Sequence, residues 1–361
     1  MTDFSPSAGD HDGDALIAQL EARADRRSER REFFRTALGA GAVVAAGAAA
    51  VAIGSSASAD ATSDAAILNF ALNLEYLEAQ FYSFAVFGTG LPNSQLTPGS
   101  ASTTTQGAVT GGRQVSFRDP LVAQYAREIA GDETQHVAFL RAQLGTAAVA
   151  MPAIDIGSTA TSAFTIAARA AGLATNASGA IDNTNGTFDP YASDENFLLA
   201  AYLFEDVGVT AYKGAAQAIT TKTYLDAAAG ILAAEAYHAS IIRTVLYSKG
   251  LATPSLRTSA DAISDARDKL DGLVDDDQGI SPVKFVAPGT AVTAGTQLSA
   301  NAPALVGLTA SNIVPTGPEG LVYGRAIGNV LNIVYLNSAA VSKGGFFPNG
   351  LNGTYATSTA N

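Results

Sequence analysis

Two short stretches, Glu133-Thr134-Gln135-His136 and Glu235-Ala236-Tyr237-His238, carry the pattern that decides the fold. Each places a glutamate three residues before a histidine, and on a helix residues i and i+3 lie on the same face, one turn apart. Each pair can therefore point at one centre. The chain has 361 residues, three histidines and no cysteine, so two of its three imidazoles belong to these motifs. The lack of cysteine excludes disulfides, thiolate catalysis and thiolate metal sites.

Each motif lies within a long predicted helix. The helix around the first motif begins at Asp119-Pro120, an N-cap followed by proline at the first helical position, and ends before Gly145. The helix around the second motif opens at Thr223, with Asp226 three residues on in the manner of a capping box, and closes at Gly250. Both motifs thus fall on extended helical surfaces.

Two further helices, predicted over residues 64–87 and 193–219, match each other in register. Each carries a glutamate followed by a tyrosine seven residues later on an apolar seam. The first seam consists of Leu68, Leu72, Glu75, Ala79, Tyr82 and Val86, and the second of Leu198, Tyr202, Glu205, Val209, Tyr212 and Ala216. The chain therefore reads as two copies of one helical hairpin.

The fold expected from these helices is all-α, a four-helix bundle over residues 60–250. Helices of roughly 25 residues are typical of such bundles and longer than the average globular helix. Residues 88–118 are rich in Gly, Ser and Thr and predict a long loop. Residues 146–192, with a short helix over 161–173, are long enough to act as a crossover. A long crossover allows the second and third helices to lie parallel.

The lone glutamates of the two seams complete a candidate metal centre. A single Glu-x-x-His on a helix is usually a solvated pair, but here two such motifs join two glutamates on apolar seams. Four buried carboxylates repel one another unless they are protonated or neutralised, and two divalent cations would balance them. Mixed carboxylate and imidazole ligands suit iron or manganese, so two iron or two manganese ions, or one of each, are expected. The predicted ligands are Glu75, Glu133, His136, Glu205, Glu235 and His238.

Five neighbouring residues have roles that the sequence leaves open. Glu78 is either an accessory ligand or a carboxylate on the helix flank. Tyr82 and Tyr212 either hydrogen-bond a ligand carboxylate, act as radical sources or simply pack. Asp132 and Asp206 adjoin predicted ligands, and either orient a histidine or belong to the solvated surface.

Residues 1–59 have the three-part pattern of an export signal. A polar segment ends in Arg30-Arg31-Glu32-Phe33-Phe34-Arg35, and an Ala/Gly/Val run over 36–54 and a small-residue stretch follow. The arginine pair resembles a twin-arginine signal, which predicts cleavage after Ala59, a translocase as partner during export and a periplasmic or extracellular location. The alternative is a permanent N-terminal membrane anchor. His11 lies within this segment, apart from the predicted ligands.

Residues 251–361 predict an extension with many loops and two helices, over 260–273 and 324–337, followed by the tail 344–350, Gly-Gly-Phe-Phe-Pro-Asn-Gly. We expect it to act as a lid or brace on the bundle rather than as a second catalytic domain. The formal net charge of −12 argues against a nucleic-acid partner, because such binding rests on clustered Lys and Arg.

The spacing of Glu-x6-Tyr and Glu-x-x-His resembles that of the ferritin-like superfamily, over about residues 64–250. The signal, the long loops and the C-terminal tail look like the exported ferritin-like proteins grouped with desiccation-related stress proteins. This resemblance implies the bundle and the di-metal centre. A ferritin storage shell is not expected, because the long 88–118 loop and the extension would hinder its closure, although a smaller homo-oligomer stays possible.

Three functions fit the sequence. The first is a di-metal oxidoreductase in oxidative or desiccation stress, acting on oxygen, on peroxide in the manner of a manganese catalase, or on ferrous iron in the manner of a ferroxidase. The second is a stress-protective protein that binds metal without turnover. The third is a structural bundle that has kept the ligands and lost the chemistry.

Overall fold

The computed structural model describes residues 56–272, 276–291, 297–300, 302–317 and 319–361. The chain divides into two units, Met1–Ala57 and Ser58–Asn361, and nearly all described residues belong to the second. The predicted signal, including His11 and the apolar run 36–54, thus lies almost wholly outside the described residues. Within the described residues, no helix combines the length and the apolar character that a membrane span requires.

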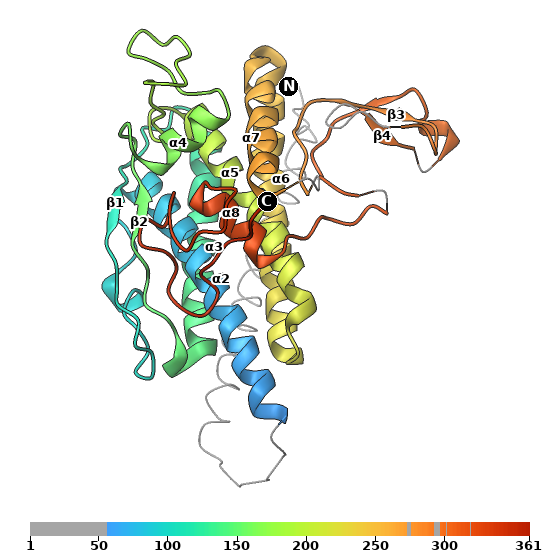
Figure 1. Ribbon diagram of the computed structural model, residues 1–361. Helices are drawn as coiled ribbons and strands as arrows, with labels where there is room; N and C mark the ends of the chain where they lie inside the picture. The colour runs from blue at the N-terminus through green and yellow to red at the C-terminus, as the bar shows by residue number, and fades with distance from the viewer. Residues whose placement is uncertain (1–55, 273–275, 292–296, 301, 318) are drawn as a thin grey trace, which may run out of the picture. The chain divides into compact units, whose positions relative to one another are not determined.

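Four long helices form the bundle: α2 (Ser56–Phe87), α3 (Pro120–Leu144), α5 (Asp194–Ala215) and α6 (Lys222–Ala252) (Figure 1). The Asp119 side chain accepts a hydrogen bond from the backbone N–H of Leu121, and proline follows at the first helical position, so α3 begins as predicted. The Ser193 side chain caps α5 in the same way, through the N–H of Asn196. The all-α four-helix prediction is confirmed.

Some helix ends differ from the sequence prediction. Helix α2 already begins at Ser56, and α5 gives way to a 3-10 turn at Ala216–Ala218. Helix α6 begins at Lys222 with Thr221 as its N-cap residue, so the capping box expected at Thr223 is wrong. Asp64 of α2 explains the shift, because its carboxylate accepts hydrogen bonds from the backbone N–H groups just before the helix, those of Thr220 and Thr221.

Side-chain contacts at the helix ends establish the relative direction of the helices. The Asp194 carboxylate, at the start of α5, accepts hydrogen bonds from the backbone N–H groups of Arg118 and Asp119, just before α3. The first turns of α3 and α5 therefore lie together, and the two helices run parallel as the long crossover predicts. Lys249, near the end of α6, lies 3.3 Å from Asp119 and 3.0 Å from Glu195, so α6 runs opposite to both.

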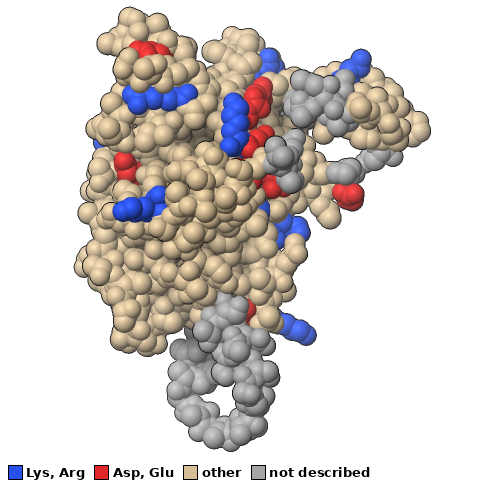
Figure 2. Space-filling model, in the orientation of Figure 1, with Lys and Arg blue, Asp and Glu red and all other residues tan. Residues whose placement is uncertain are grey.

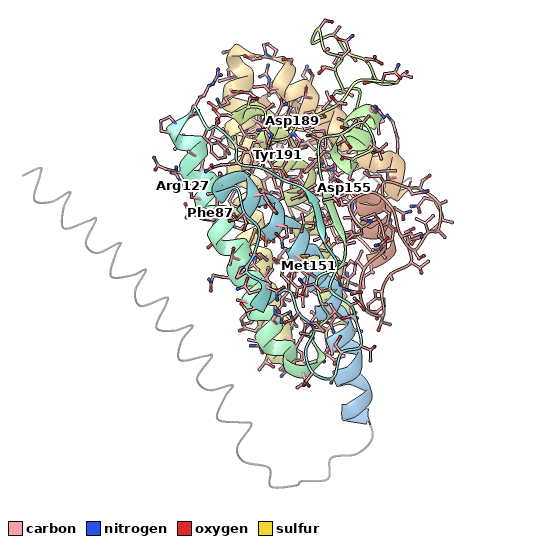
Figure 3. All side chains as sticks on the ribbon, turned by 90° about the vertical axis from the view of Figure 1, so that its left-hand side faces the viewer. Phe87, Arg127, Met151, Asp155, Asp189 and Tyr191 are labelled. Atoms are coloured by element: carbon pink, nitrogen blue, oxygen red, sulfur yellow. The ribbon has the colours of Figure 1, made fainter. Side chains whose placement is uncertain are left out.

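The two linkers pair with each other. Strand β1 (Val109–Gly111) lies parallel to β2 (Ile154–Ile156), with Val109 opposite Ile154. Strands of three residues are too short to show periodicity in the sequence. The second linker also holds α4 (Ala163–Ala170), the predicted short helix, and Tyr191, whose hydroxyl donates to the backbone oxygen of Ile156 (Figure 3). Short 3-10 turns at Asn93–Gln95 and Gly145–Ala147 complete these connections.

The extension packs on the bundle through its helices. Helix α7 (Ser255–Asp271) contacts α5 and α6, and α8 (Ile327–Tyr335) contacts α5 and α7. A small sheet between them has the order β4-β3-β5, with β3 (Val283–Val286) parallel to β4 (Gln297–Ser299) and antiparallel to β5 (Thr309–Ala310). A 3-10 turn at Pro303–Leu305 precedes β5.

Aromatic side chains join the extension to the bundle core. Phe346 of the tail contacts Phe164 of α4 and Phe204 of α5, with ring centroids 5.1 and 4.9 Å apart. Phe81 of α2 packs on Phe164 and Phe204 at 5.3 and 5.7 Å. Rings of this size contribute most of the apolar burial in a core. On the face shown in Figure 2, charged side chains are scattered over a largely uncharged surface.

Candidate metal centre

All six predicted ligands meet between the four helices of the bundle. Helix α2 supplies Glu75, α5 supplies Glu205, and α3 and α6 each supply one Glu-x-x-His pair. All six residues are buried: the four glutamates are at most 1% exposed and the two histidines at most 9%. The seam positions of α2 and α5 and the i, i+3 spacing on α3 and α6 direct these side chains inward.

The six residues form two overlapping groups of four. One group contains Glu75, Glu133, His136 and Glu235, and within it one ligand atom from each residue lies within 4.8 Å of the others. The second group contains Glu205 and His238 together with the same Glu133 and Glu235. The glutamates of the two Glu-x-x-His motifs are therefore shared, and the lone glutamates belong to one group each.

The histidines lie one on each side of the shared carboxylates. His136 Nδ1 is 3.1 Å from Glu75 Oε2, 3.4 Å from Glu235 Oε1 and 3.5 Å from Glu133 Oε2. His238 Nδ1 is 3.0 Å from Glu133 Oε1 and 3.6 Å from Glu205 Oε2. The two ring centroids are 6.1 Å apart. Both imidazoles thus direct Nδ1 toward the carboxylate oxygens.

Several of these buried ligand atoms have no hydrogen-bond partner. They are both carboxylate oxygens of Glu133, both of Glu235, Glu205 Oε2 and His238 Nδ1. A buried polar atom without a partner costs free energy, and a carboxylate costs most. Metal cations would satisfy these atoms, and the oxygen and imidazole donor set fits iron or manganese. The residues present therefore fit the expected pair of ions.

The electrostatics of the cluster also show a demand for positive charge. Burial, together with the Glu133 charge and despite His136, raises the pKa of Glu75 to about 8. Burial and neighbouring carboxylates likewise raise the pKa of Glu205 and of Glu235. Burial acts to lower the pKa of His136, but Glu75 and Glu133 outweigh it and raise that pKa well above its ordinary value. Protons on these groups would offset part of the carboxylate charge, and metal ions would displace them.

Tyr82 and Tyr212 hold the lone glutamates across the bundle. Tyr82 of α2 donates a hydrogen bond to Glu205 of α5, and Tyr212 of α5 donates to Glu75 of α2. Both tyrosines are buried. Each tyrosine therefore fixes one oxygen of the opposite glutamate and leaves the other oxygen toward the cluster, so neither ring merely packs.

The two flanking aspartates differ. Asp132 Oδ2 lies 3.3 Å from His238 Nε2, on the far side of the imidazole from the cluster, with a side chain that is 52% exposed. Asp206 is neither near a histidine nor solvated: it is 2% exposed and pairs with Arg243 and Arg267 at 2.8 and 3.0 Å. Both alternatives for Asp206 are wrong, because residue 206 leaves α5 on a different side from Glu205.

Glu78 is buried beside the centre and is not an exposed carboxylate on the helix flank. Burial, followed by the charges of Glu235, Glu133, Glu205 and Glu75, raises its pKa well above the ordinary value. It belongs to neither group of four. The structure therefore places Glu78 next to the six predicted ligands and separate from them.

A second buried cluster of charges lies between the bundle and the extension, and the sequence gives no sign of it. It joins three arginines to three aspartates, all at most 2% exposed. These residues are Asp206, Arg243, Arg267, Asp271, Asp277 and Arg325. Its members come from α5, α6, α7 and two loops, and no local spacing relates them.

Sequence comparisons with known proteins identify relatives of this chain. The sequence model of the family described as "Ferritin-like domain" matches residues 63–248. Desiccation-related protein PCC13-62 of Craterostigma plantagineum is 34% identical over 187 residues, and the chain spans about half of it (54%) and matches over 52% of its own length. Ferritin-like catalase Nec2 of Nesocodon mauritianus is 26% identical over 301 residues, 81% of this chain and 85% of that protein. No solved structure gives a significant match.

Proposed function

The chain belongs to the ferritin-like family, and we propose that it binds two iron or two manganese ions between its four bundle helices and uses them to decompose hydrogen peroxide. The observation that carries the proposal is the pair of overlapping four-residue groups that share Glu133 and Glu235. Their buried atoms without partners support a bound cation on each side of the shared carboxylates.

The residues of the chain define what each would do in that reaction. Two redox-active ions held close together supply the exchange of two electrons. Two peroxide molecules are then consumed, one oxidised to dioxygen and the other reduced to two waters with the protons that the first releases. Glu133 and Glu235 would hold both ions, while His136 with Glu75 and His238 with Glu205 would each hold one. Tyr82 and Tyr212 would fix the lone carboxylates, and burial of the ligands would limit access of water.

The similarity to a protein named as a ferritin-like catalase supports peroxide as the substrate, because the match extends over 81% of this chain and 85% of that protein. Exported stress protection is the setting that the N-terminal pattern and the desiccation-related relative support. N-terminal sequencing of the exported protein tests this part, with a mature start at Asp60 expected. A retained N-terminus on a membrane-bound protein would favour the anchor instead.

Metal analysis and gas evolution test the central proposal together. Protein produced with both metals should contain about two ions per chain and release oxygen from peroxide. Glu133→Ala and His238→Ala should lose both properties. Glu195→Ala, which replaces a partly exposed glutamate at the start of α5, should keep them. A wild-type content of no more than about a tenth of an ion per chain, against the two that such a site holds, contradicts the proposal.

A second candidate function is protective metal binding without turnover, because the 34% identical relative is named for desiccation and not for a reaction. Oxygen uptake with ferrous iron and oxygen release from peroxide separate the two candidates. Full metal loading with neither reaction would support the binding protein. Oxygen uptake without peroxide decomposition would make ferrous iron the substrate.

A further inference from the structure

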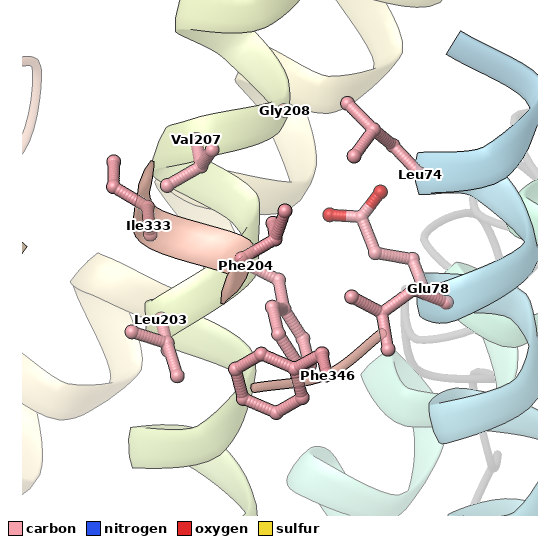
Figure 4. Close-up of a pocket in the computed structure, with 10 residues that line it drawn as sticks. Leu74, Glu78, Leu203, Phe204, Val207, Gly208, Ile333 and Phe346 are labelled. Carbon is pink, nitrogen blue, oxygen red and sulfur yellow. The ribbon is translucent and has the colours of Figure 1, made fainter. Parts of the chain in front are cut away.

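An apolar cavity lies directly beside the candidate metal centre (Figure 4). Its walls come from Leu74 of α2, Leu203 and Val207 of α5, and Ile333 and Phe346 of the extension. Its volume of about 20 Å³ has room for a molecule about the size of water. Among the described residues that line it, Glu78 is the one with an ionisable side chain, and its carboxyl group points from α2 toward α5.

Gly208 connects this cavity to the centre. It lines the cavity, and a Cβ atom built on it would lie 2.4 Å from Glu235 Oε2 and 3.5 Å from Glu78 Oε1. The carboxylate of Glu235, a shared residue of the centre, therefore packs where a side chain of residue 208 would lie, and the Glu78 carboxylate lies next to it. No side chain of α5 separates the cavity from Glu235 at this point.

The internal repeat makes this arrangement asymmetric. Glu75 and Glu205 occupy equivalent positions on α2 and α5, and the residue three positions later is Glu78 on α2 but Gly208 on α5. The bundle thus has an additional carboxylate on α2, whereas on α5 the glycine leaves the place of a side chain to the Glu235 carboxylate. The four glutamates among the predicted ligands follow the repeat. The difference between Glu78 and Gly208 departs from it, and both of these residues line the cavity.

We propose that this cavity is the chamber in which a small uncharged oxygen species, hydrogen peroxide or dioxygen, reaches the centre, and that Glu78 is the carboxylate it meets there. The proposal rests on the function proposed above and adds the route. Apolar walls accept a small neutral molecule, whereas a hydrated ferrous ion would lose its water without gaining ligands along them. Peroxide has O–H groups that can donate to the Glu78 carboxylate at the inner end.

Xenon binding tests the chamber without reference to activity, because apolar cavities bind this atom. Crystals of the metal-loaded protein under xenon pressure should show xenon between Val207 and Phe346. Val207→Phe should exclude it by filling the space. Ile166→Phe is the matched control, since Ile166 lines a different apolar pocket beside α4. Absence of xenon from the wild-type cavity would overturn the proposal.

Kinetics of the same variants test the route. Val207→Phe should keep its metal content and lower kcat/KM for peroxide at least about tenfold, while Ile166→Phe should match the wild type. If Val207→Phe excludes xenon in crystals and yet decomposes peroxide with wild-type kinetics in solution, the route is overturned. The proposed function would still stand in that case. Failure of the wild type to bind metal or decompose peroxide would instead overturn the function.

Glu78→Gln keeps the size of the side chain and covers the case in which Val207→Phe fails to fold. Metal content and xenon occupancy should stay at wild-type levels, and kcat/KM for peroxide should fall at least about tenfold. Loss of metal in this variant would make Glu78 a ligand and contradict its assignment to the substrate. Unaltered kinetics would also contradict that assignment.

Discussion

Two clusters of buried charge meet at neighbouring residues of α5, and they differ in how their charges are neutralised. Glu205 faces the candidate metal centre, and Asp206 faces the buried ion-pair network formed with Arg243, Arg267 and their partners. In the network each charged group has a group of opposite sign within 3.0 Å, for example Arg325 and Asp271 at 2.5 Å. The centre instead gathers four carboxylates around two imidazoles.

The difference separates a structural cluster from one built to bind a ligand. The three arginines and three aspartates of the network balance each other in charge. Two of its atoms, Arg267 Nε and Asp271 Oδ1, have no hydrogen-bond partner, but both residues are ion-paired within the network. The centre leaves six buried side-chain atoms without hydrogen-bond partners, from Glu133, Glu205, Glu235 and His238. Protons or cations must supply the missing positive charge. Burial of charge alone therefore does not mark a functional site, whereas an unbalanced set of ligand atoms does.

Breaking the network should have the largest effect on stability. Arg267→Met removes one of the two arginine partners of both Asp206 and Asp277, and loss of one member of a buried pair costs about 3–5 kcal/mol. The free energy of unfolding, measured with urea, should fall by this amount with and without metal. Arg113→Met, which breaks the exposed pair with Asp189, should cost at most about 1 kcal/mol. A loss confined to the metal-free protein would contradict the separation of the two clusters.

Removal of metal should destabilise the protein only when the centre is intact. A free metal concentration about 100-fold above Kd stabilises a folded protein by about 2.7 kcal/mol. Calorimetry before and after chelation should therefore show a lower Tm for the metal-free wild type. Glu133→Ala should show no such change, and Glu195→Ala should behave as the wild type. A Tm that is indifferent to metal in the wild type would count against a bound cation.

Replacement of Tyr82 or Tyr212 should lower the metal affinity of the centre without altering the ion-pair network. Tyr82→Phe or Tyr212→Phe removes the hydrogen bond to Glu205 or Glu75, and loss of such a partner typically weakens metal binding 10- to 100-fold. Titration against a competing chelator measures the change. Tyr191→Phe, which removes a buried hydrogen bond to the Ile156 backbone, is the control and should leave the metal affinity unchanged. Equal affinities in all variants would make the two tyrosines packing residues.

Asp64 offers a third case, a buried carboxylate held by neutral donors, with the smallest expected effect. Burial acts to raise its pKa, but hydrogen bonds from Thr221 and Thr220 outweigh it and hold the pKa below the ordinary 3.8. The unfolded chain then binds more protons, so the stabilisation is present above pH 3.8 and is lost as pH falls through the folded pKa. Unfolding of metal-free protein between pH 6 and 2 should show a shallower acid dependence in Asp64→Asn than in the wild type. Identical dependence would refute this.

The ligand set could be predicted from sequence because local spacing carries it. Glu133 and His136 share a helix face at three residues' distance, and the register of Glu75 with Glu205 repeats on two helices. Asp206 shows the limit of such reasoning. The position of Glu205 does not predict which way the Asp206 side chain points. The partners of Asp206, Arg243 and Arg267, lie 37 and 61 residues away in sequence.

The cavity could not be predicted from the sequence either. Its walls bring together α2, α5 and the tail, so Phe346 meets Phe204 through packing that no motif encodes. The sequence left Glu78 open between two roles because its burial depends on those distant walls. Short strands such as Val109–Gly111 escape prediction for the same reason, since the partner strand, and not local composition, determines them.

The position of Phe346 in the chain has a consequence for biosynthesis. The six candidate ligands lie between Glu75 and His238, whereas Ile333 and Phe346, which form the extension's side of the chamber, follow them in the sequence. A ribosome therefore completes the ligand-bearing helices before it makes the residues that close over them. If the centre binds metal as proposed, the order of synthesis would give loading an interval in which the ligand helices exist and the residues that cover them are still to be made.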